Sequence, residues 1–275
     1  MTVIAHLSDL HFGTEQPAVA AALLRILAAE PPDLIVVSGD LTQNATWRQF
    51  RAARAFLDRL PAPWLAVPGN HDIVGHRLLE MVLRPFRRWT WMICDDLDPE
   101  WSNGLTVVKG INTARPFGPY LNWSRGRFSA NQVETLARSV VDGRLLTIAC
   151  HHPLAFGHDR AKAYPLATRA EAVLAALSRH SRSLVLAGHR HRSHVSLWSA
   201  TAGERTVEAG ATARAGEVLI VHAGTASSDR LRGEVNSWNR VSLRADGIEV
   251  EALGFDGSGW SLLRRVAVVW PQAPQ

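Results

Sequence analysis

The stretch Leu184-Val185-Leu186-Ala187-Gly188-His189-Arg190-His191 decides how this sequence of 275 residues is interpreted. An apolar run ends at a glycine, and two histidines follow with one residue between them. Alternate residues of an extended chain point to the same side, so each such pair can aim two ligands at one point. The same spacing recurs near the N-terminus, where Asp9 and His11 follow the apolar residues 3–7.

Three further apolar runs lie between these two pairs, and each ends in polar residues. They end at Gly39-Asp40, at Gly69-Asn70-His71-Asp72 and at His151-His152-Pro153. Each run has the length and composition of a buried strand, and amphipathic segments alternate with the runs. This alternation predicts right-handed βαβ units with a mostly parallel sheet, and therefore an α/β fold.

The pattern also places the individual elements. We expect strands at residues 3–7, 34–37, 64–67, 105–111, 145–149 and 183–187. We expect helices at residues 17–30, 47–60, 129–141 and 168–178. The last two helices each begin with a candidate capping box, Ser129 with Gln132 and Thr168 with Glu171. Residues 75–104 give no clear strand and are rich in Arg and Trp, so we expect a helical insertion. This insertion either packs its tryptophans inward or forms a cap over a substrate.

The sequence changes character after residue 192, where short strand patterns replace the helices. We expect an antiparallel sheet over residues 193–270, with a two-residue hairpin turn at Asp246-Gly247. No linker rich in Pro, Ser or Gly precedes this tail. We therefore expect a single domain over residues 1–275, with the core motifs in residues 3–192 and the tail completing a second sheet.

Composition places few further limits on the protein. Apolar residues make up 47% and charged residues 20% of the chain, as is typical of globular proteins. The two cysteines, Cys94 and Cys150, are flanked by apolar residues, so we expect reduced, buried thiols in a cytoplasmic protein. No apolar run is long enough to span a bilayer, and a cleaved signal peptide would remove Asp9. The net charge of +5 either reflects solubility or attracts anionic substrates such as phosphate esters.

Ligands of open α/β sheets collect at the carboxyl ends of the strands, and five of the predicted strands carry donors there. The oxygen and imidazole donors at these ends suit Mn, Fe or Zn ions rather than a structural zinc site of cysteines. Seven donors are too many for one four-coordinate ion but suffice for two ions if one carboxylate bridges them. Asp40 is the natural bridge because it stands alone at its strand end. The seven candidate ligands are Asp9, His11, Asp40, Asn70, His151, His189 and His191.

Together, these five motifs resemble the motif set of the calcineurin-like metallophosphoesterases in order and spacing. The resemblance covers residues 9–191 and is vaguer beyond residue 192. It implies an αββα sandwich of two mixed sheets flanked by helices. Because of its small size, the chain most resembles the bacterial class III cyclic-nucleotide phosphodiesterase group within this family.

The resemblance also implies roles for these residues. One metal would be bound by Asp9, His11, Asp40 and His191, and the other by Asp40, Asn70, His151 and His189. A hydroxide bridging the metals would attack phosphorus. His71 would protonate the leaving group or steady the transition state, and Asp72 would orient His71. Neighbouring residues on a strand face opposite ways, so only one of His151 and His152 should bind metal, and the family's His-x-Pro pattern favours His151.

Several alternatives remain open at this point. The favoured function is hydrolysis of a small phosphodiester, cyclic nucleotides included. The alternative is hydrolysis of a phosphomonoester, or of a lipid or nucleotide pyrophosphate at the membrane face. The segment from Arg84 to Trp101 motivates the membrane hypothesis, because its Arg and Trp residues would suit peripheral membrane contact. A non-catalytic binding scaffold is the alternative of another class. No stable nucleic-acid partner is expected, since no extended basic groove is visible. For Arg230-Leu231-Arg232 we expect a solvated loop rather than contact with substrate.

Overall fold

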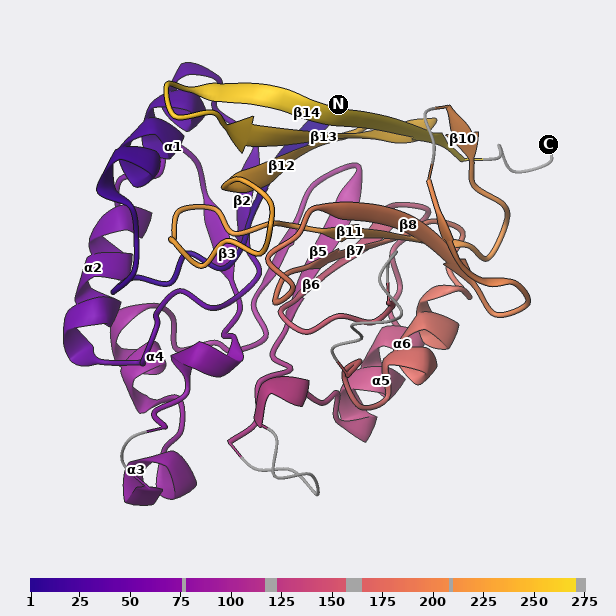
Figure 1. Cartoon of the computed structure of the whole chain (residues 1–275). Helices are drawn as coiled ribbons and strands as arrows, with labels where there is room; N and C mark the ends of the chain where they lie inside the picture. The colour runs from indigo at the N-terminus through magenta and orange to yellow at the C-terminus, as the bar shows by residue number, and fades with distance from the viewer. Residues whose placement is uncertain (76–77, 117–122, 157–164, 208–209, 271–275) are drawn as a thin grey trace.

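Two mixed β-sheets lie face to face in the computed structural model of the chain, with helices on their outer sides (Figure 1). The structure describes residues 1–75, 78–116, 123–156, 165–207 and 210–270. Within these ranges each sheet has seven strands. The first sheet consists, in spatial order, of β10 (Ala211–Thr212), β14 (Trp260–Val269), β13 (Gly247–Phe255), β12 (Ser237–Leu243), β1 (Thr2–Leu7), β2 (Leu34–Val37) and β3 (Trp64–Ala66). The second consists of β4 (Glu100–Ser102), β5 (Thr106–Ile111), β6 (Leu145–Cys150), β7 (Ser183–Ala187), β11 (Val218–His222), β8 (His194–Ser199) and β9 (Gly203–Thr206).

The helices form the two outer layers, which confirms the αββα arrangement. Helices α1 (Pro17–Ala29), α2 (Trp47–Leu57) and α4 (Arg87–Met92) lie outside the first sheet, and α3 (Leu78–Leu83) extends below them in Figure 1. Helices α5 (Ala130–Ala137) and α6 (Ala170–Leu177) cover the second sheet. One apolar core therefore fills the space between the sheets, and one lies under each helical layer.

Strand β2 shows why the central strands are apolar along their whole length. Leu34 and Val36 face the core between the sheets, whereas Ile35 and Val37 face the helices. All four side chains are fully buried. Strands that are covered on both faces read as continuous apolar runs rather than as alternating ones. This is why such a run marks a central strand in the sequence.

The two predicted capping boxes have different outcomes. Helix α5 begins after Ser129, whose hydroxyl accepts from the Gln132 N–H while the Gln132 side chain accepts from the Ser129 N–H, as predicted. The predicted cap of α6 by Thr168 is wrong. Arg169 is the residue that precedes this helix, with a left-handed φ of 67°, and it makes no side-chain cap. Thr168 instead pairs through its backbone with Gly126 and Phe128.

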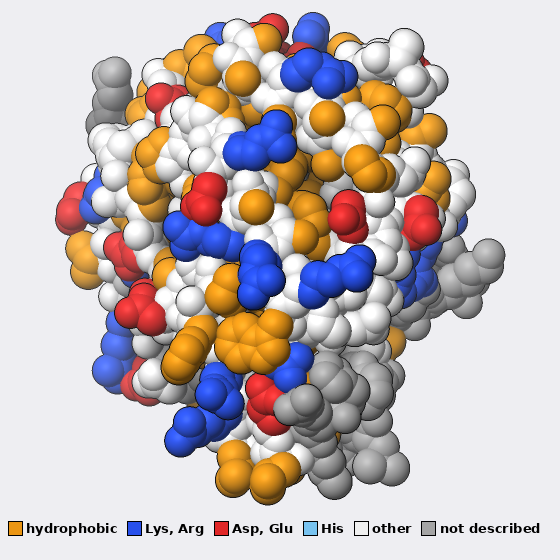
Figure 2. All heavy atoms as spheres, turned by 90° about the vertical axis from the view of Figure 1, so that its left-hand side faces the viewer, with side chains coloured by type: hydrophobic (Ala, Val, Ile, Leu, Met, Phe, Trp, Pro, Cys, Tyr) orange, Lys and Arg blue, Asp and Glu red, His pale blue; other side chains and the backbone are white. Residues whose placement is uncertain are grey.

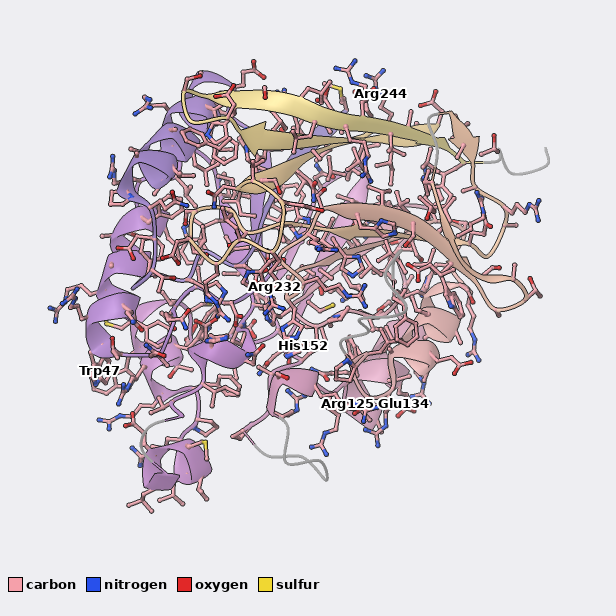
Figure 3. All side chains as sticks on the ribbon, in the orientation of Figure 1. Trp47, Arg125, Glu134, His152, Arg232 and Arg244 are labelled. Carbon is pink, nitrogen blue, oxygen red and sulfur yellow. The ribbon has the colours of Figure 1, made fainter. Side chains whose placement is uncertain are left out.

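The Arg- and Trp-rich insertion contains the short helices α3 and α4, and also strand β4, which its sequence does not predict. Its tryptophans differ in burial. Trp89 is fully buried and packs edge-to-face on Phe50, with 6.4 Å between ring centroids. Trp91 is 72% exposed and lies beside Trp47, which Figure 3 shows at the outer edge of the molecule. The insertion is therefore only partly buried.

The tail departs from the single antiparallel sheet that its sequence predicts. Strand β11 enters the second sheet parallel to β7, whereas β12 enters the first sheet antiparallel to β1. The tail thus extends both sheets. Strand β12 pairs with the edge of β1 that β2 leaves free, and β11 pairs with the edge of β7 that β6 leaves free. The hairpin between β12 and β13 is present but shifted by one residue: Arg244 donates to Gly247, which leaves Ala245 and Asp246 as the turn.

The connection between β11 and β12, residues 223–236, crosses from one sheet to the other; we call it the crossover loop. Because β11 is parallel to β7 and β12 is antiparallel to β1, this loop lies at the edge where β1 and β7 end. Both cysteines are free thiols; Cys150 is buried as expected, but Cys94 is only partly buried. In the described ranges, no helix combines the length and apolarity that a bilayer crossing requires.

Candidate metal centre

The structure brings the predicted donors together at one edge of the two sheets. They follow β1, β2 and β3 of the first sheet and β6 and β7 of the second. The carboxyl ends of these parallel strands meet at this edge, as the α/β architecture requires. All seven side chains are buried, namely Asp9, His11, Asp40, Asn70, His151, His189 and His191.

One group of donors comes from the loops after β1 and β7. The Asp9 Oδ1 atom lies 3.2 Å from His191 Nε2 and 3.6 Å from His11 Nε2. The two imidazole Nε2 atoms are 3.3 Å apart. Three donor atoms therefore converge on one point from segments 180 residues apart in sequence.

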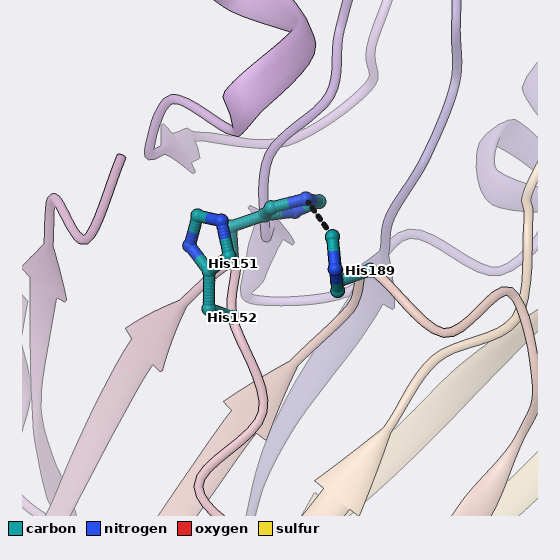
Figure 4. Close-up of side chains that lie close together, drawn as sticks. All are labelled: His151, His152 and His189. Atoms are coloured by element: carbon teal, nitrogen blue, oxygen red, sulfur yellow. Dashed lines mark hydrogen bonds between the residues drawn. The ribbon is translucent and has the colours of Figure 1, made fainter. Parts of the chain in front are cut away.

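A second group forms around Asp40. Its Oδ2 atom lies 3.2 Å from His151 Nε2, which in turn lies 3.2 Å from His189 Nδ1 (Figure 4). The same Oδ2 atom is 3.7 Å from Nε2 of His11, a member of the first group. A single carboxylate oxygen thus lies within reach of both groups, which is the geometry that a bridging ligand needs.

These separations fit the coordination of a metal ion. For bonds of about 2.0–2.2 Å, neighbouring ligands of a tetrahedral or octahedral ion lie about 2.8–3.6 Å apart. The donor separations of 3.2–3.7 Å fall at or near this range. In addition, Asn70 Oδ1 is buried and accepts no hydrogen bond from the described residues. A bound cation would satisfy this oxygen, so the residues present fit a metal centre of oxygen and imidazole ligands.

The backbone at these residues is left-handed, which corrects the extended geometry that the spacing suggests. The φ angles are 53° at Asp9, 45° at His11, 52° at Asp40, 72° at His189 and 58° at His191. Such angles are uncommon in non-glycine residues, although Asp and His adopt them more often than most. As a result His189 and His191 point to different groups of donors rather than to a single point.

The charges in the centre are strongly coupled. Burial alone would raise the pKa of the Asp40 carboxyl, but the nearby His151 and His11 lower it well below its usual range. Burial disfavours the charged form of His151, yet Asp40 raises the pKa of this histidine to about 9. Burial, together with the charge of His151, lowers the pKa of His189 to about 3. Asp40 is thus anionic and His189 neutral, as metal ligands must be, whereas His151 has to release a proton when a metal binds.

The structure distinguishes His151 from its neighbour His152. His151 directs Nε2 to Asp40, and its Nδ1 donates to the Ser38 carbonyl at 2.9 Å, which fixes the ring. His152 bonds through Nδ1 to Thr113 Oγ1 at 2.8 Å, and its ring lies edge-on to that of His151 (Figure 4). It nevertheless lies 5.0 Å from the His189 ring, measured between centroids. His151 therefore contacts Asp40 directly, whereas His152 bonds to Thr113 but still has a ring nitrogen within 4.8 Å of nitrogens of His151 and His189.

The hydrogen bonds of Asp72 go to two loops and not to the His71 ring, which Asp72 was predicted to orient. The Asp72 carboxylate accepts hydrogen bonds from the N–H groups of Leu41, Thr42 and Gly69 and from the Thr42 hydroxyl. Burial, followed by the charge of Asp40, raises the pKa of Asp72 to about 7. Asp72 thus ties the loop after β2 to the loop after β3.

His71 is oriented by another residue. Its Nδ1 atom lies 2.7 Å from the Gln43 carbonyl oxygen and must donate to it. Its backbone N–H donates to Asp40 Oδ1 at 2.8 Å. The prediction that Asp72 orients His71 is therefore wrong for the contacts seen here, and Gln43 takes that place.

Arg230 of the crossover loop contacts the centre, although its sequence suggested a solvated loop. Its carbonyl oxygen accepts from His191 Nδ1 at 2.7 Å, and its Nη1 donates to His71 Nε2 at 2.9 Å. Arg232 of the same loop is partly buried and is labelled near the centre of the view in Figure 3. No motif marks Arg230 in the sequence; only the pairing of β11 and β12 would have placed it here.

A pocket of about 560 Å³ opens beside His71. This volume is typical of sites for small organic ligands. No carboxylate is among the described residues that line it, so its walls do not repel an anion. They are Gln43, Asn44, Thr46, Asn70, His71, Ile73, Gly75, Met81 and Pro116.

Comparison with known proteins agrees with this geometry. The sequence profile of the calcineurin-like phosphoesterase family matches residues 2–193, and the chain belongs to this family. It is accordingly a metal-dependent phosphoesterase. A probable glycerophosphodiester phosphodiesterase GpdQ of Arcobacter nitrofigilis is 25% identical over 72% of this chain and 74% of its own length. A probable cyclic nucleotide phosphodiesterase of Synechococcus is 27% identical over 70% of this chain and 74% of its own.

Solved structures agree on the fold. A dimetal phosphatase from Danio rerio superposes with a TM-score of 0.66 at 14% identity, covering 98% of this chain and 99% of its own. The purple acid phosphatase PPD1 of yellow lupin superposes with a TM-score of 0.74 at 11% identity over 98% of this chain. The matched part is only 53% of the lupin protein.

Proposed function

We propose that this phosphoesterase is a dinuclear enzyme that hydrolyses small phosphodiesters. The observation that carries the dinuclear part is the position of Asp40 Oδ2, 3.7 Å from His11 Nε2 and 3.2 Å from His151 Nε2. The remaining ligands divide between the two sides of this oxygen. We assign Asp9, His11, Asp40 and His191 to one ion, and Asp40, Asn70, His151 and His189 to the other.

Each residue contributes to this chemistry in a definable way. Two ions bound at these donors would supply Lewis acidity and lower the pKa of a water molecule held between them. Asp9 and Asp40 supply the negative charge that offsets two cations, whereas Asn70 coordinates without adding charge. The centre thus keeps a net positive charge toward a phosphate. Gln43 and Ser38 fix the rings of His71 and His151 through their carbonyl oxygens.

The preference for diesters rests on two observations. The relatives described above are named for glycerophosphodiesters and for cyclic nucleotides, and both kinds of substrate are phosphodiesters. The pocket beside His71 provides space for a second substituent on the phosphate, and its walls carry no carboxylate in the described residues. A cyclic nucleotide or a glycerophosphodiester would therefore fit both observations.

A comparison of chromogenic substrates tests this proposal. Protein stripped with a chelator and reloaded with Mn²⁺ would be assayed with bis(4-nitrophenyl) phosphate and with 4-nitrophenyl phosphate. We expect a higher kcat/KM for the diester and two bound ions per chain. A higher kcat/KM for the monoester would refute the diester preference. One ion per chain would refute the dinuclear assignment, and no rescue by Mn²⁺, Fe²⁺ or Zn²⁺ would favour a non-catalytic scaffold.

A second candidate is a substrate carried by a membrane, and helix α3 favours it. Leu79, Val82 and Leu83 are 73%, 50% and 67% exposed, while Met81 of the same short helix lines the pocket. Figure 2 shows the side of the molecule that lies at the left in Figure 1, with hydrophobic and basic side chains close together at its lower end. Exposed apolar residues beside cations suit an anionic bilayer surface. Co-sedimentation with phosphatidylglycerol vesicles that Leu79→Asp abolishes would support this candidate, and no binding by the wild type would exclude it.

A further inference from the structure

The crossover loop is rigidly held over the metal centre. The Thr225 hydroxyl donates to the Asp9 carbonyl at 2.6 Å, and the Ser227 hydroxyl to the Leu10 carbonyl at 3.2 Å. Asn236 spans the loop by donating to the Ser228 carbonyl at 2.8 Å. The base of the loop is therefore fixed to the segment that carries Asp9 and His11.

Arg230 projects from this fixed base toward the pocket. Its backbone carbonyl accepts from His191 Nδ1, so its main chain is tied to one candidate metal ligand. Its guanidinium bonds to His71 Nε2 at 2.9 Å and to Gln43 Oε1 at 3.2 Å. His71 and Gln43 both line the pocket. The guanidinium thus contacts two residues of the pocket wall, one of which, His71, is next to the candidate ligand Asn70.

The hydrogen bonds also limit what His71 can do in this arrangement. An arginine only donates, so His71 Nε2 accepts from Arg230, while His71 Nδ1 donates to Gln43. At this contact the donated N–H group therefore belongs to Arg230. Within the described residues, Arg230 forms these hydrogen bonds through Nη1 alone. Its Nη2 and Nε retain their donor capacity.

We propose that Arg230 is a substrate-binding residue that donates to the phosphoryl oxygens of the ester. A guanidinium matches two phosphate oxygens at once, and such charge-assisted bonds are stronger than neutral ones. His71 and Gln43 hold the side chain beside the pocket. Arg230 lies outside residues 2–193, the range that the family profile matches. This inference rests on the proposed function, the hydrolysis of small phosphodiesters at this centre.

The test compares variants of Arg230 in the metal-loaded enzyme, with inorganic phosphate as the probe. Arg230→Ala should weaken inhibition by phosphate and raise KM for bis(4-nitrophenyl) phosphate by roughly 10- to 100-fold. Arg230→Lys should restore part of the loss, because it keeps the charge but not the two-point contact. Bound metal should not change, since His191 contacts the backbone oxygen of Arg230 rather than its side chain.

Arg232→Ala is the matched control, because it removes the same charge from the same loop. An unchanged phosphate inhibition constant in Arg230→Ala would overturn the proposal, as would equal effects of Arg230→Ala and Arg232→Ala. Loss of bound metal in Arg230→Ala that Arg230→Lys does not restore would assign Arg230 a structural role instead. An inactive wild-type enzyme would refute the proposed function itself, so the two failures are distinguishable.

Discussion

The close approach of Gly69 to Asp40 makes Gly69→Ala a sensitive probe of the metal centre. A Cβ atom on Gly69 would lie 2.1 Å from Asp40 Oδ1 and 2.5 Å from the Asp40 backbone nitrogen. Rotating the carboxylate could relieve the first contact but not the second. Ordinary contact begins at 3.4 Å, so the two chain segments must separate by roughly 1 Å.

That displacement determines the expected magnitudes. Metal sites tolerate errors of about 0.2 Å in ligand distance, so a shift of Asp40 affects both ions at once. Altering only an outer partner of a ligand costs about 10- to 100-fold in metal affinity or activity, and we expect at least this loss. Overpacking should also destabilise the fold by about 1–3 kcal/mol. For a chain of this size, that corresponds to a fall in Tm of roughly 2–12 °C.

The assay is a titration of metal-free protein with Mn²⁺, followed by metal content and by hydrolysis of bis(4-nitrophenyl) phosphate. Gly104→Ala is the control, because a Cβ atom there meets nothing within 4 Å. It should bind metal and hydrolyse substrate as the wild type does. If Gly69→Ala bound two ions with wild-type affinity and turned over normally, the placement of Asp40 between the two donor groups would be refuted.

Three further predictions concern residues around the centre and away from it. Asp72→Ala should lower the free energy of unfolding in urea by more than about 3 kcal/mol, because three buried N–H groups lose their acceptor; unchanged stability would contradict this. Ser129→Ala should cost about 1 kcal/mol by removing the cap that pairs with Gln132, with kcat unaffected. Although burial favours the neutral acid, the hydrogen bond from Arg205 lowers the pKa of Glu217. Its contribution is therefore present above the unfolded pKa of about 4.3 and is lost as pH falls below it. Unfolding measured between about pH 6 and pH 3 should show a shallower loss of stability in Glu217→Gln.

The sequence predicted the fold where local and tertiary requirements agree. Strand β2 is buried on both faces, so its apolar run is unambiguous, and Ser129 caps its helix through contacts three residues away. The predictions failed where contacts with residues distant in sequence determine the local structure. Thr168 has the sequence of a cap, but its backbone pairs with Gly126 and Phe128 instead. Strands β11 and β12 join different sheets because each pairs with a strand that has an unpaired edge, β7 and β1 respectively. No local sequence pattern indicates which strands have such an edge.

The same distinction applies to the candidate site. The donors could be found because each follows an apolar strand, and the strand ends of an α/β fold converge. The partner of Asp72 could not be found in this way. The family resemblance implied His71, whereas the carboxylate accepts from the loop after β2. Arg230 was missed because its position depends on the crossing between the sheets rather than on a motif.

The left-handed backbone of the donors links these observations. Asp9 and His11 would each cost about 1 kcal/mol or more in this conformation if nothing held them there. The structure holds them through their own backbone, since the Asp9 N–H donates to the Gly39 carbonyl at 3.1 Å and the His11 N–H to the Asp40 carbonyl at 2.9 Å. The crossover loop adds the bond from Thr225 to the Asp9 carbonyl. These hydrogen bonds tie the loops to one another, so the geometry of the centre depends on the tail as much as on the motifs.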